Sequence, residues 1–386
     1  MNRGGLLANL PSEIIIDIIS RLPVRSIIRC KRVCKSWLNL LNTPEFIESH
    51  HSKSTPGLAV LQYQLPEIFL MLFEVEDEIE PEHHELHYIP ITEFDVQAFM
   101  RLFHSIVIQG SAKGLLLLRE ISQEPDSLYI CNPITREYTK ISSLETKKRY
   151  YPTVVTYGFG VSSLTGQYKV IRISHDRVLD PDTQELLSIP RNECHIYALQ
   201  TGSWRSIRSG EPMEYNCRSN GVLLNGSLHW FVKDLKGSFL ISCLDLEREV
   251  FTTFSSPFHL PESQKSLVEL AALEGSLCLC DNSSENEIVI WIMKEYGVEK
   301  SWSKEFVISK FPNHVGETYE TVHPIKIFKD GDILMCWGDL YLFYYCHKTK
   351  AIQPTSMTGH SLEAIFHSPT FLSLKNLNEN VIVSTF

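Results

Sequence analysis

Apolar residues in the first fifty positions recur at the spacing of amphipathic helices. Pro11 and Ser12 predict the start of a first helix, which Pro23 ends. Its apolar residues line two sides, with Ile14, Ile18 and Leu22 on one and Ile15 and Ile19 on the other. A short helix that is apolar on two sides needs two partners. We therefore expect one side to pack within its own module and the other to form an interface.

A second helix is predicted to begin at Ser26, which is a suitable N-cap. One side of this helix is apolar and comprises Ile27, Cys30, Val33, Cys34, Trp37 and Leu41. Much of the other side is basic and comprises Arg25, Arg29, Lys31, Arg32 and Lys35. Thr43 and Pro44 then begin a short third helix that contains Phe46. The pattern predicts a small all-α module of three short helices.

Beyond Pro56 the pattern changes to short apolar runs, separated by Gly, Asn, Asp and Ser, which are typical of β-strands. Five of these runs resemble one another, at residues 128–131, 195–199, 240–244, 288–292 and 340–345. Their central residues are Tyr129, Tyr197, Cys243, Ile290 and Phe343, and the spacings between them are 68, 46, 47 and 53 residues. A repeat of about fifty residues is typical of the four-stranded blades of a kelch-type β-propeller.

Turn signals within each repeat support this count, as at Asn225-Gly226, Glu274-Gly275 and Asp330-Gly331. They predict five blades, at about residues 105–141, 152–208, 219–254, 267–307 and 323–355. Runs at 58–63, 68–75 and 86–91, together with a run at 362–367, supply the strands of a sixth blade. A blade built from both ends of the chain closes the ring and leaves no open sheet edge. The predicted fold class is therefore a small all-α module followed by an all-β propeller of six blades.

Two polar segments interrupt the strand pattern. Residues 174–192 predict an oversized polar loop. Residues 74–87 contain seven acidic residues and three histidines, and they predict a solvated loop. Within it, Glu82, His83, His84, Glu85 and His87 are of the types that bind zinc. Because the segment lacks a rigid frame, we predict no metal site.

Charge is distributed unevenly along the chain. The apolar content of 43% against 21% charged residues is sufficient for a packed core. The formal net charge is -10, but residues 1–53 carry +4 and the remainder carries -14. A large acidic part disfavours nucleic acid as a partner.

Signals for export, membrane insertion and known catalytic motifs are missing from the sequence. The N-terminus lacks the features of a signal peptide, and the longest strongly apolar run, residues 68–73, is too short to cross a bilayer. Most of the ten cysteines lie in apolar runs, and Cys278 and Cys280 alternate on one strand, so we expect reduced thiols that pack in the core. The GxSxG, HExxH and phosphate-loop patterns are absent. We expect a protein of the cytoplasm or nucleus, without membrane partner, catalytic residues or cofactor.

Three phrases near the N-terminus together resemble the F-box. They are Leu10-Pro11-Ser12-Glu13-Ile14, Arg21-Leu22-Pro23-Val24 and Cys30-Lys31-Arg32-Val33-Cys34-Lys35-Ser36-Trp37, with Phe46 beyond. Their order, their spacing and the terminal Trp agree with that motif, so residues 6–50 are identified as an F-box.

Residues 56–386 resemble the F-box-associated interaction domain of plant F-box proteins. The matching phrases occur in the expected order: Lys113-Gly114-Leu115-Leu116, Cys131-Asn132-Pro133-Ile134-Thr135-Arg136, Tyr157-Gly158-Phe159-Gly160, Tyr168-Lys169-Val170, Gly202-Ser203-Trp204-Arg205 and Leu228-His229-Trp230. The resemblance thus covers nearly the whole chain.

The resemblance implies that the F-box docks on a Skp-type adaptor, which bridges to a cullin, while the propeller holds a protein for ubiquitination. The chain itself would catalyse nothing. The implied adaptor face comprises Leu10, Pro11, Ile14, Ile18, Leu22, Pro23, Val24, Ile27, Val33, Cys34 and Trp37.

Two other functions remain open at this point. One is an enzyme on a propeller scaffold, such as a glycosidase or a copper oxidase, which would need carboxylates or Tyr, His and Cys ligands that converge at the axis. The other is a scaffold protein whose F-box binds partners outside ubiquitin ligation. The sequence alone places no such convergent residues.

Long connections predict where a substrate binds. On the strand map, the connections on one propeller face are long, at residues 174–192, 209–218, 255–266 and 308–322. Irregular loops on a rigid scaffold often carry binding residues. We predict polar substrate contacts from Arg177, Asp180, Asp182 and Arg191, and apolar anchors from Tyr215, Phe258 and Tyr319.

Overall fold

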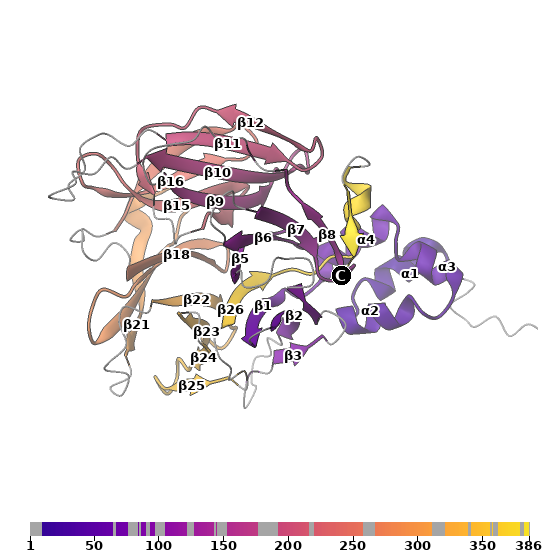
Figure 1. Ribbon diagram of the computed structural model, residues 1–386. Helices are drawn as coiled ribbons and strands as arrows, with labels where there is room; N and C mark the ends of the chain where they lie inside the picture. The colour runs from indigo at the N-terminus through magenta and orange to yellow at the C-terminus, as the bar shows by residue number, and fades with distance from the viewer. Residues whose placement is uncertain are drawn as a thin grey trace, which may run out of the picture.

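The chain folds into a module of short helices joined to a ring of β-sheets, as the computed structural model shows (Figure 1). The structure describes residues 10–64, 67–75, 84, 86–89, 93–96, 105–121, 127–142, 144, 153–176, 192–215, 220–257, 267–310, 321–338, 341–355, 357, 362–378 and 382–385. Among these residues, no helix has the length and apolar character needed to span a bilayer.

Residues 10–53, which the structure describes without a gap, form four helices where the sequence predicted three. They are α1 (Ser12–Ile19), α2 (Val24–Cys30), α3 (Lys35–Leu40) and α4 (Pro44–Lys53). The predicted second helix is split by a turn that ends at Cys34, whose backbone is extended. In one continuous helix, Ile27 and Leu41 would lie about 21 Å apart. The turn instead lets both side chains reach the same core, where each is fully buried.

Six blades follow as predicted, and their main strands lie within a few residues of the predicted positions. Residues 94–95, 214–215 and 384–385 form short additional strands that were not predicted. Blade 1 contains β26 (Leu362–His367), β1 (Gly57–Gln64), β2 (Glu67–Val75), β3 (Leu86–Tyr88) and β4 (Phe94–Asp95). Blade 2 contains β5 (Ser105–Ala112), β6 (Leu115–Ile121), β7 (Ser127–Asn132), β8 (Glu137–Lys140) and β27 (Ser384–Thr385). Blade 3 contains β9 (Thr153–Val161), β10 (Tyr168–Asp176), β11 (Asn192–Ala198) and β12 (Ser203–Ile207).

The remaining blades have the same antiparallel order. Blade 4 contains β13 (Glu214–Tyr215), β14 (Val222–Leu224), β15 (Ser227–Lys233), β16 (Phe239–Asp245) and β17 (Val250–Ser255). Blade 5 contains β18 (Val268–Leu273), β19 (Ser276–Asp281), β20 (Glu287–Met293) and β21 (Trp302–Ser309). Blade 6 contains β22 (Val322–Ile327), β23 (Ile333–Trp337), β24 (Tyr341–Tyr345) and β25 (Ile352–Pro354). Contacts run in turn through β26, β5, β9, β14, β18 and β22, which form the inner ring.

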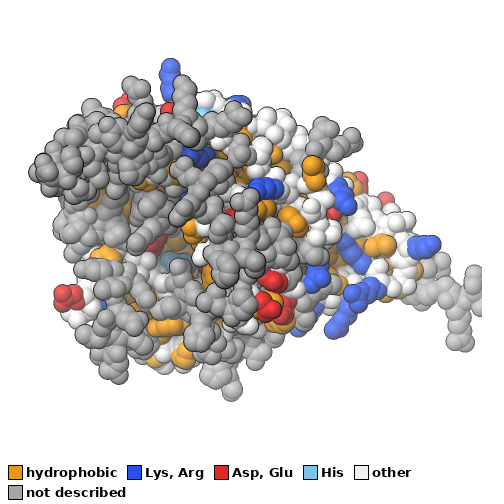
Figure 2. Space-filling view, in the orientation of Figure 1, with side chains coloured by type: hydrophobic (Ala, Val, Ile, Leu, Met, Phe, Trp, Pro, Cys, Tyr) orange, Lys and Arg blue, Asp and Glu red, His pale blue; other side chains and the backbone are white. Residues whose placement is uncertain are grey.

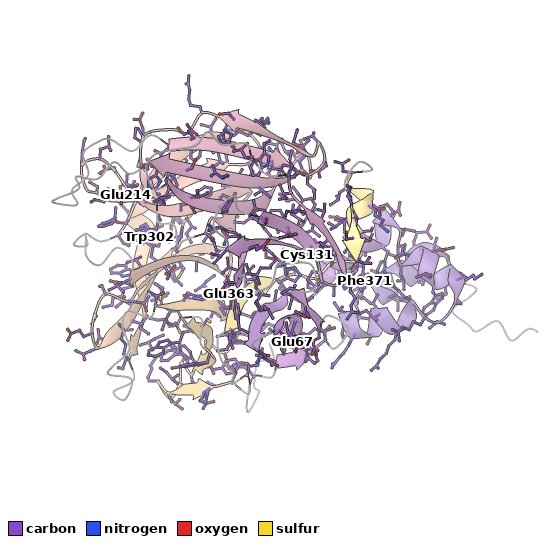
Figure 3. All side chains as sticks on the ribbon, in the orientation of Figure 1. Glu67, Cys131, Glu214, Trp302, Glu363 and Phe371 are labelled. Carbon is purple, nitrogen blue, oxygen red and sulfur yellow. The ribbon has the colours of Figure 1, made fainter. Side chains whose placement is uncertain are left out.

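The ring closes as predicted, with strands from both ends of the chain in blade 1. Strand β26 pairs antiparallel with β1, so that Leu362 lies opposite Gln62 and His367 opposite Gly57. The Glu363 carboxylate, labelled in Figure 3, accepts a hydrogen bond of 2.9 Å from the Ile108 amide of β5. The closing strand is therefore tied to both of its neighbours in the inner ring.

Local signals in the sequence also predicted the turns and the buried thiols. Asn225 and Gly226 both have positive φ, at 50° and 72°, as a tight two-residue hairpin requires. Cys278 and Cys280 are fully buried in a cluster shared by blades 5 and 6. The predicted loop at residues 74–87 was too wide at both ends, because Glu74 belongs to β2 and residues 86–88 form β3. Long-range pairing with β2 overrides the local acidity there.

We predict that removal of residues 361–386 opens the ring. The deletion takes away β26 and exposes the edge of β1, so the protein should aggregate or melt at a clearly lower temperature. Size-exclusion chromatography and thermal melting measure this. A matched truncation after Asn378 removes only β27 and should remain soluble. A soluble 361–386 deletion with an unchanged melting temperature would contradict the role of β26.

Candidate functional site

The helical module leaves four large apolar side chains exposed to solvent. They are Ile14, Ile18, Val33 and Leu38, with exposures of 46%, 45%, 65% and 40%, and we call them the exposed apolar set. Ile14 and Ile18 lie one turn apart on α1, while Ile15 and Ile19 on the other side are buried. The two stripes of α1 are thus divided as predicted, one in the core and one available to a partner.

The structure divides the predicted adaptor residues into three groups. Pro11, Ile14, Ile18, Pro23, Val33 and Cys34 are exposed. Leu10, Leu22 and Trp37 are partly buried against the core. Val24 and Ile27 are 3% and 0% exposed, so both serve the core rather than a docking face. Leu38 was not predicted, because it lies off the apolar stripe of the helix that the sequence predicted.

Basic side chains share the surface of the helical module with the exposed apolar set. Figure 2 shows Lys and Arg side chains gathered over the helical module. Arg25, Arg29, Arg32 and Lys35 are all exposed, as the amphipathic pattern predicted. Asp17 on α1 accepts hydrogen bonds of 3.0 Å from Arg21 and 2.7 Å from Lys53, and these contacts lower the pKa of its carboxyl group. The surface of the module thus carries both apolar and basic side chains.

The helical module is joined to the propeller through a shared core. Only residues 54–56 separate α4 from β1. Phe46 and His50 of α4 pack on Phe371, which follows β26, with ring centroids 6.0 and 5.1 Å apart (Figure 3). The Lys31 ammonium lies 4.6 Å from the centre of the Phe371 ring, and burial lowers its pKa to about 8. One hydrophobic cluster thus contains residues of the helices, blade 1 and blade 2.

A carboxylate of the propeller caps a helix of the module. The Val24 amide, one of the unpaired donors at the start of α2, donates a 2.7 Å hydrogen bond to Oε1 of Glu74. Nε of Arg25 lies 3.6 Å from the other oxygen of the same carboxylate. Because Glu74 is on β2, this contact fixes α2 against blade 1.

The segment after β26 straps the module to blade 2. The Asn132 side-chain amide donates to the Thr370 and Leu372 carbonyls at 3.1 and 2.6 Å. The Glu137 carboxylate accepts from the Leu374 amide at 2.8 Å. Gly114 has φ +84°, and a Cβ there would lie 2.2 Å from Thr370, so glycine is required where the strap crosses the β5–β6 turn. The module and the ring are therefore joined by the shared core, by the Glu74 carboxylate and by the strap.

The strand order separates two faces of the ring. In each blade, the connections between the first and second strands and between the third and fourth strands share one face. Strand β1 is the second strand of blade 1, so the helical module joins the ring on this face. The opposite face carries the four connections where long loops were predicted, which are β10–β11, β12–β13, β17–β18 and β21–β22.

Of the predicted substrate residues, the structure describes Tyr215. Tyr215 is 2% exposed, its ring contacts Trp230 at 6.1 Å, and its hydroxyl lies 3.1 Å from the Ser242 hydroxyl. It therefore packs in the core and is not an exposed anchor, because β13 places it between blades 3 and 4. Arg177, Asp180, Asp182, Arg191, Phe258 and Tyr319 lie outside the described residues.

Comparisons with known proteins agree with this architecture. Residues 7–50 match the F-box-like family, and residues 68–353 match the F-box associated beta propeller domain. The chain is 31% identical to F-box protein At3g07870 of Arabidopsis thaliana, over 94% of this chain and 89% of that protein. It is 29% identical to F-box protein CPR1 of the same organism, over 84% of this chain and 78% of that protein.

The chain is an F-box protein and belongs to the family whose propeller is the F-box associated domain. An F-box/kelch-repeat protein, also of Arabidopsis thaliana, is 27% identical over 77% of this chain and 78% of its own length. The predicted family and fold class are confirmed.

We predict that acid weakens the joint between module and ring. Burial lowers the pKa of His50 to about 4 and that of His367 to about 3, against about 6.5 when unfolded. Below pH 6.5 the unfolded chain binds protons that the folded chain does not, so the free energy of unfolding falls as pH falls towards 4. Each histidine contributes up to about 1.4 kcal/mol per pH unit.

Thermal melting between pH 7 and pH 5 tests this dependence. His50→Phe retains a ring against Phe46 and Phe371 but cannot be protonated, so its melting temperature should fall less than that of the wild type. An equal fall in both proteins would show that His50 does not contribute.

Proposed function

We propose that this chain is the substrate-receptor subunit of a Skp–cullin–F-box ubiquitin ligase. The exposed apolar set docks on a Skp-type adaptor, and the adaptor connects the complex to a cullin. The observation that carries the proposal is the division of α1, whose Ile15 and Ile19 serve the core while Ile14 and Ile18 remain exposed. Four of the thirteen exposed large apolar side chains of the described chain lie on this small module.

The rigid joint supports a positioning role. A ligase must present its substrate at a fixed place relative to the rest of the complex, and free rotation between docking module and substrate domain would prevent that. Here the shared core, the Glu74 cap and the strap through Phe371 fix the module on the ring. In this proposal the chain contributes binding and orientation, and catalysis comes from other subunits.

The substrate is proposed to bind on the face of the ring opposite the module. Four connections with predicted long loops leave the ring there, between strands that are well paired. Loops on a rigid scaffold vary without loss of the fold, so they suit recognition of a protein substrate. A substrate held there lies away from the adaptor, and both partners bind at once.

We predict that Ile14→Ala combined with Ile18→Ala weakens adaptor binding at least about tenfold. Each change removes three carbon atoms, burial of a CH₂ group is worth about 0.8 kcal/mol, and 1.4 kcal/mol corresponds to tenfold in affinity. Calorimetry with a purified Skp-type adaptor measures the affinity. Both side chains are about half exposed, so the melting temperature should change little.

A matched pair of substitutions provides the control. Leu235→Ala and Val250→Ala remove side chains of similar exposure, 53% and 54%, from blade 4, and should leave adaptor affinity unchanged. Unchanged affinity in the Ile14/Ile18 variant would move the docking face elsewhere. A cullin that co-purifies with the wild type but not with the Ile14/Ile18 variant would indicate a ligase. Absence of a cullin from both would indicate a scaffold without ligase function.

We predict that replacing residues 177–191 with a short Gly/Ser turn weakens substrate capture and leaves adaptor binding intact. The exchange keeps β10 to Asp176 and β11 from Asn192, so the blade retains its pairing. Quantitative mass spectrometry of proteins captured by wild type and variant measures the effect, and co-captured adaptor is the internal control. If wild type and variant capture every protein other than the adaptor equally, the substrate site lies elsewhere.

A further inference from the structure

A histidine and two aspartates meet where blade 1 adjoins blade 6. His84 lies between β2 and β3, and Asp330 and Asp332 flank Gly331 in the turn between β22 and β23. Nε2 of His84 lies 3.2 Å from Oδ2 of Asp330 and 3.5 Å from Oδ2 of Asp332. The three ligand atoms all lie within 4.8 Å of one another. Both connections leave their blades on the face that carries the helical module.

The His84 ring is buried and oriented, but its nitrogens are not satisfied. The side chain is 4% exposed and stacks on Phe328, with ring centroids 3.8 Å apart and an angle of 18° between the planes. Tyr344 lies on another side at 5.5 Å. Neither ring nitrogen makes a hydrogen bond, although Oδ2 of Asp330 is close to Nε2. The short contact therefore does not have the geometry of a hydrogen bond. A buried imidazole without a hydrogen-bond partner is costly and requires another explanation.

Both carboxylates are aimed at the same point by backbone amides. Oδ1 of Asp332 accepts from the His347 amide at 2.8 Å, and Oδ1 of Asp330 accepts from the Asp332 amide at 3.0 Å. The second oxygen of each carboxylate is thereby directed towards His84. Their side chains are only 11% and 14% exposed. Two carboxylates at close range and little exposed need a positive charge between them.

We propose that His84, Asp330 and Asp332 bind one zinc ion. Zinc lies about 2.0–2.2 Å from nitrogen and oxygen ligands, so two ligands at the tetrahedral angle are about 3.3 Å apart. The two observed separations fall on either side of this distance. An imidazole with two carboxylates is a ligand set that zinc accepts, and the amide bonds to the carboxylates are of the kind that orient metal ligands. Water takes the fourth position.

The proposed site departs from the expectation that the acidic segment binds no metal. That expectation rested on the lack of a rigid frame around His84 within its own segment. The frame comes from blade 6, through Phe328 and the Asp330–Asp332 turn, which no local pattern around His84 indicates.

The proposed zinc ion joins blade 6 to blade 1, the blade in which both ends of the chain meet. The same two blades share a hydrophobic cluster that includes Leu58, Phe73, Phe328 and Leu334. A metal bridge between segments far apart in the sequence stabilises the closed ring, because it binds the folded chain and not the unfolded one. In this proposal zinc has a structural role between blades 6 and 1 and is not part of the docking face.

Titration of chelator-treated full-length protein with zinc chloride tests the proposal. Calorimetry should show one zinc ion per chain, and zinc should raise the melting temperature. His84→Ala and the near-isosteric Asp332→Asn should each weaken zinc binding at least tenfold and abolish the rise. The control is His347→Ala, which removes an exposed histidine beside the site but keeps the backbone amide that holds Asp332. This variant should bind zinc like the wild type.

The visible absorption of bound cobalt provides a second readout. A tetrahedral cobalt complex should form in the wild type and in His347→Ala, and be lost in His84→Ala. Equal zinc binding by wild type and His84→Ala would mean an adventitious ion only. If zinc fails to raise the melting temperature while His84→Ala lowers it without metal, the cluster is an ion pair and the proposal is wrong.

Discussion

The antiparallel pairing of β26 with β1 is the interaction on which the rest of the structure depends. It joins the two ends of the chain in one blade, so the edge of β1 that faces the inner ring is paired with β26 rather than open. It also places residues 368–378 against blade 2, where they form hydrogen bonds with Asn132 and Glu137. Phe371 is placed against α4 only because β26 ends beside the start of β1. The strand pairing that closes the ring therefore also positions the residues that hold the helices.

This coupling gives the molecule its working geometry. The helical module has no independent core of its own, since Phe46, Ile27 and Leu41 pack in the same cluster as residues of blades 1 and 2. A docking face and a propeller that share a core move together. The proposed adaptor and substrate sites are thereby kept on opposite faces at a fixed distance, which suits a receptor that must position what it binds.

Several buried ionisable groups lie at these joints. His50 and His367 lie between module and ring, and the low pKa of each reflects the loss of water around the imidazole. His84 and its two aspartates lie at the junction of blades 1 and 6. Glu74 holds α2.

The sequence by itself determined the features that depend on residues close together in the chain. Turn residues such as Asn225-Gly226 and the repeat of about fifty residues predicted six blades and their closure, because hairpins form between neighbours in the chain. The stripes of α1 likewise predicted one buried and one exposed side. Only the tertiary structure decided which neighbour covers each side. The split of the second helix, the burial of Tyr215 and the aspartates beside His84 depend on residues far away in the sequence. A periodic pattern shows that a side is apolar or charged, but its partner is set by packing.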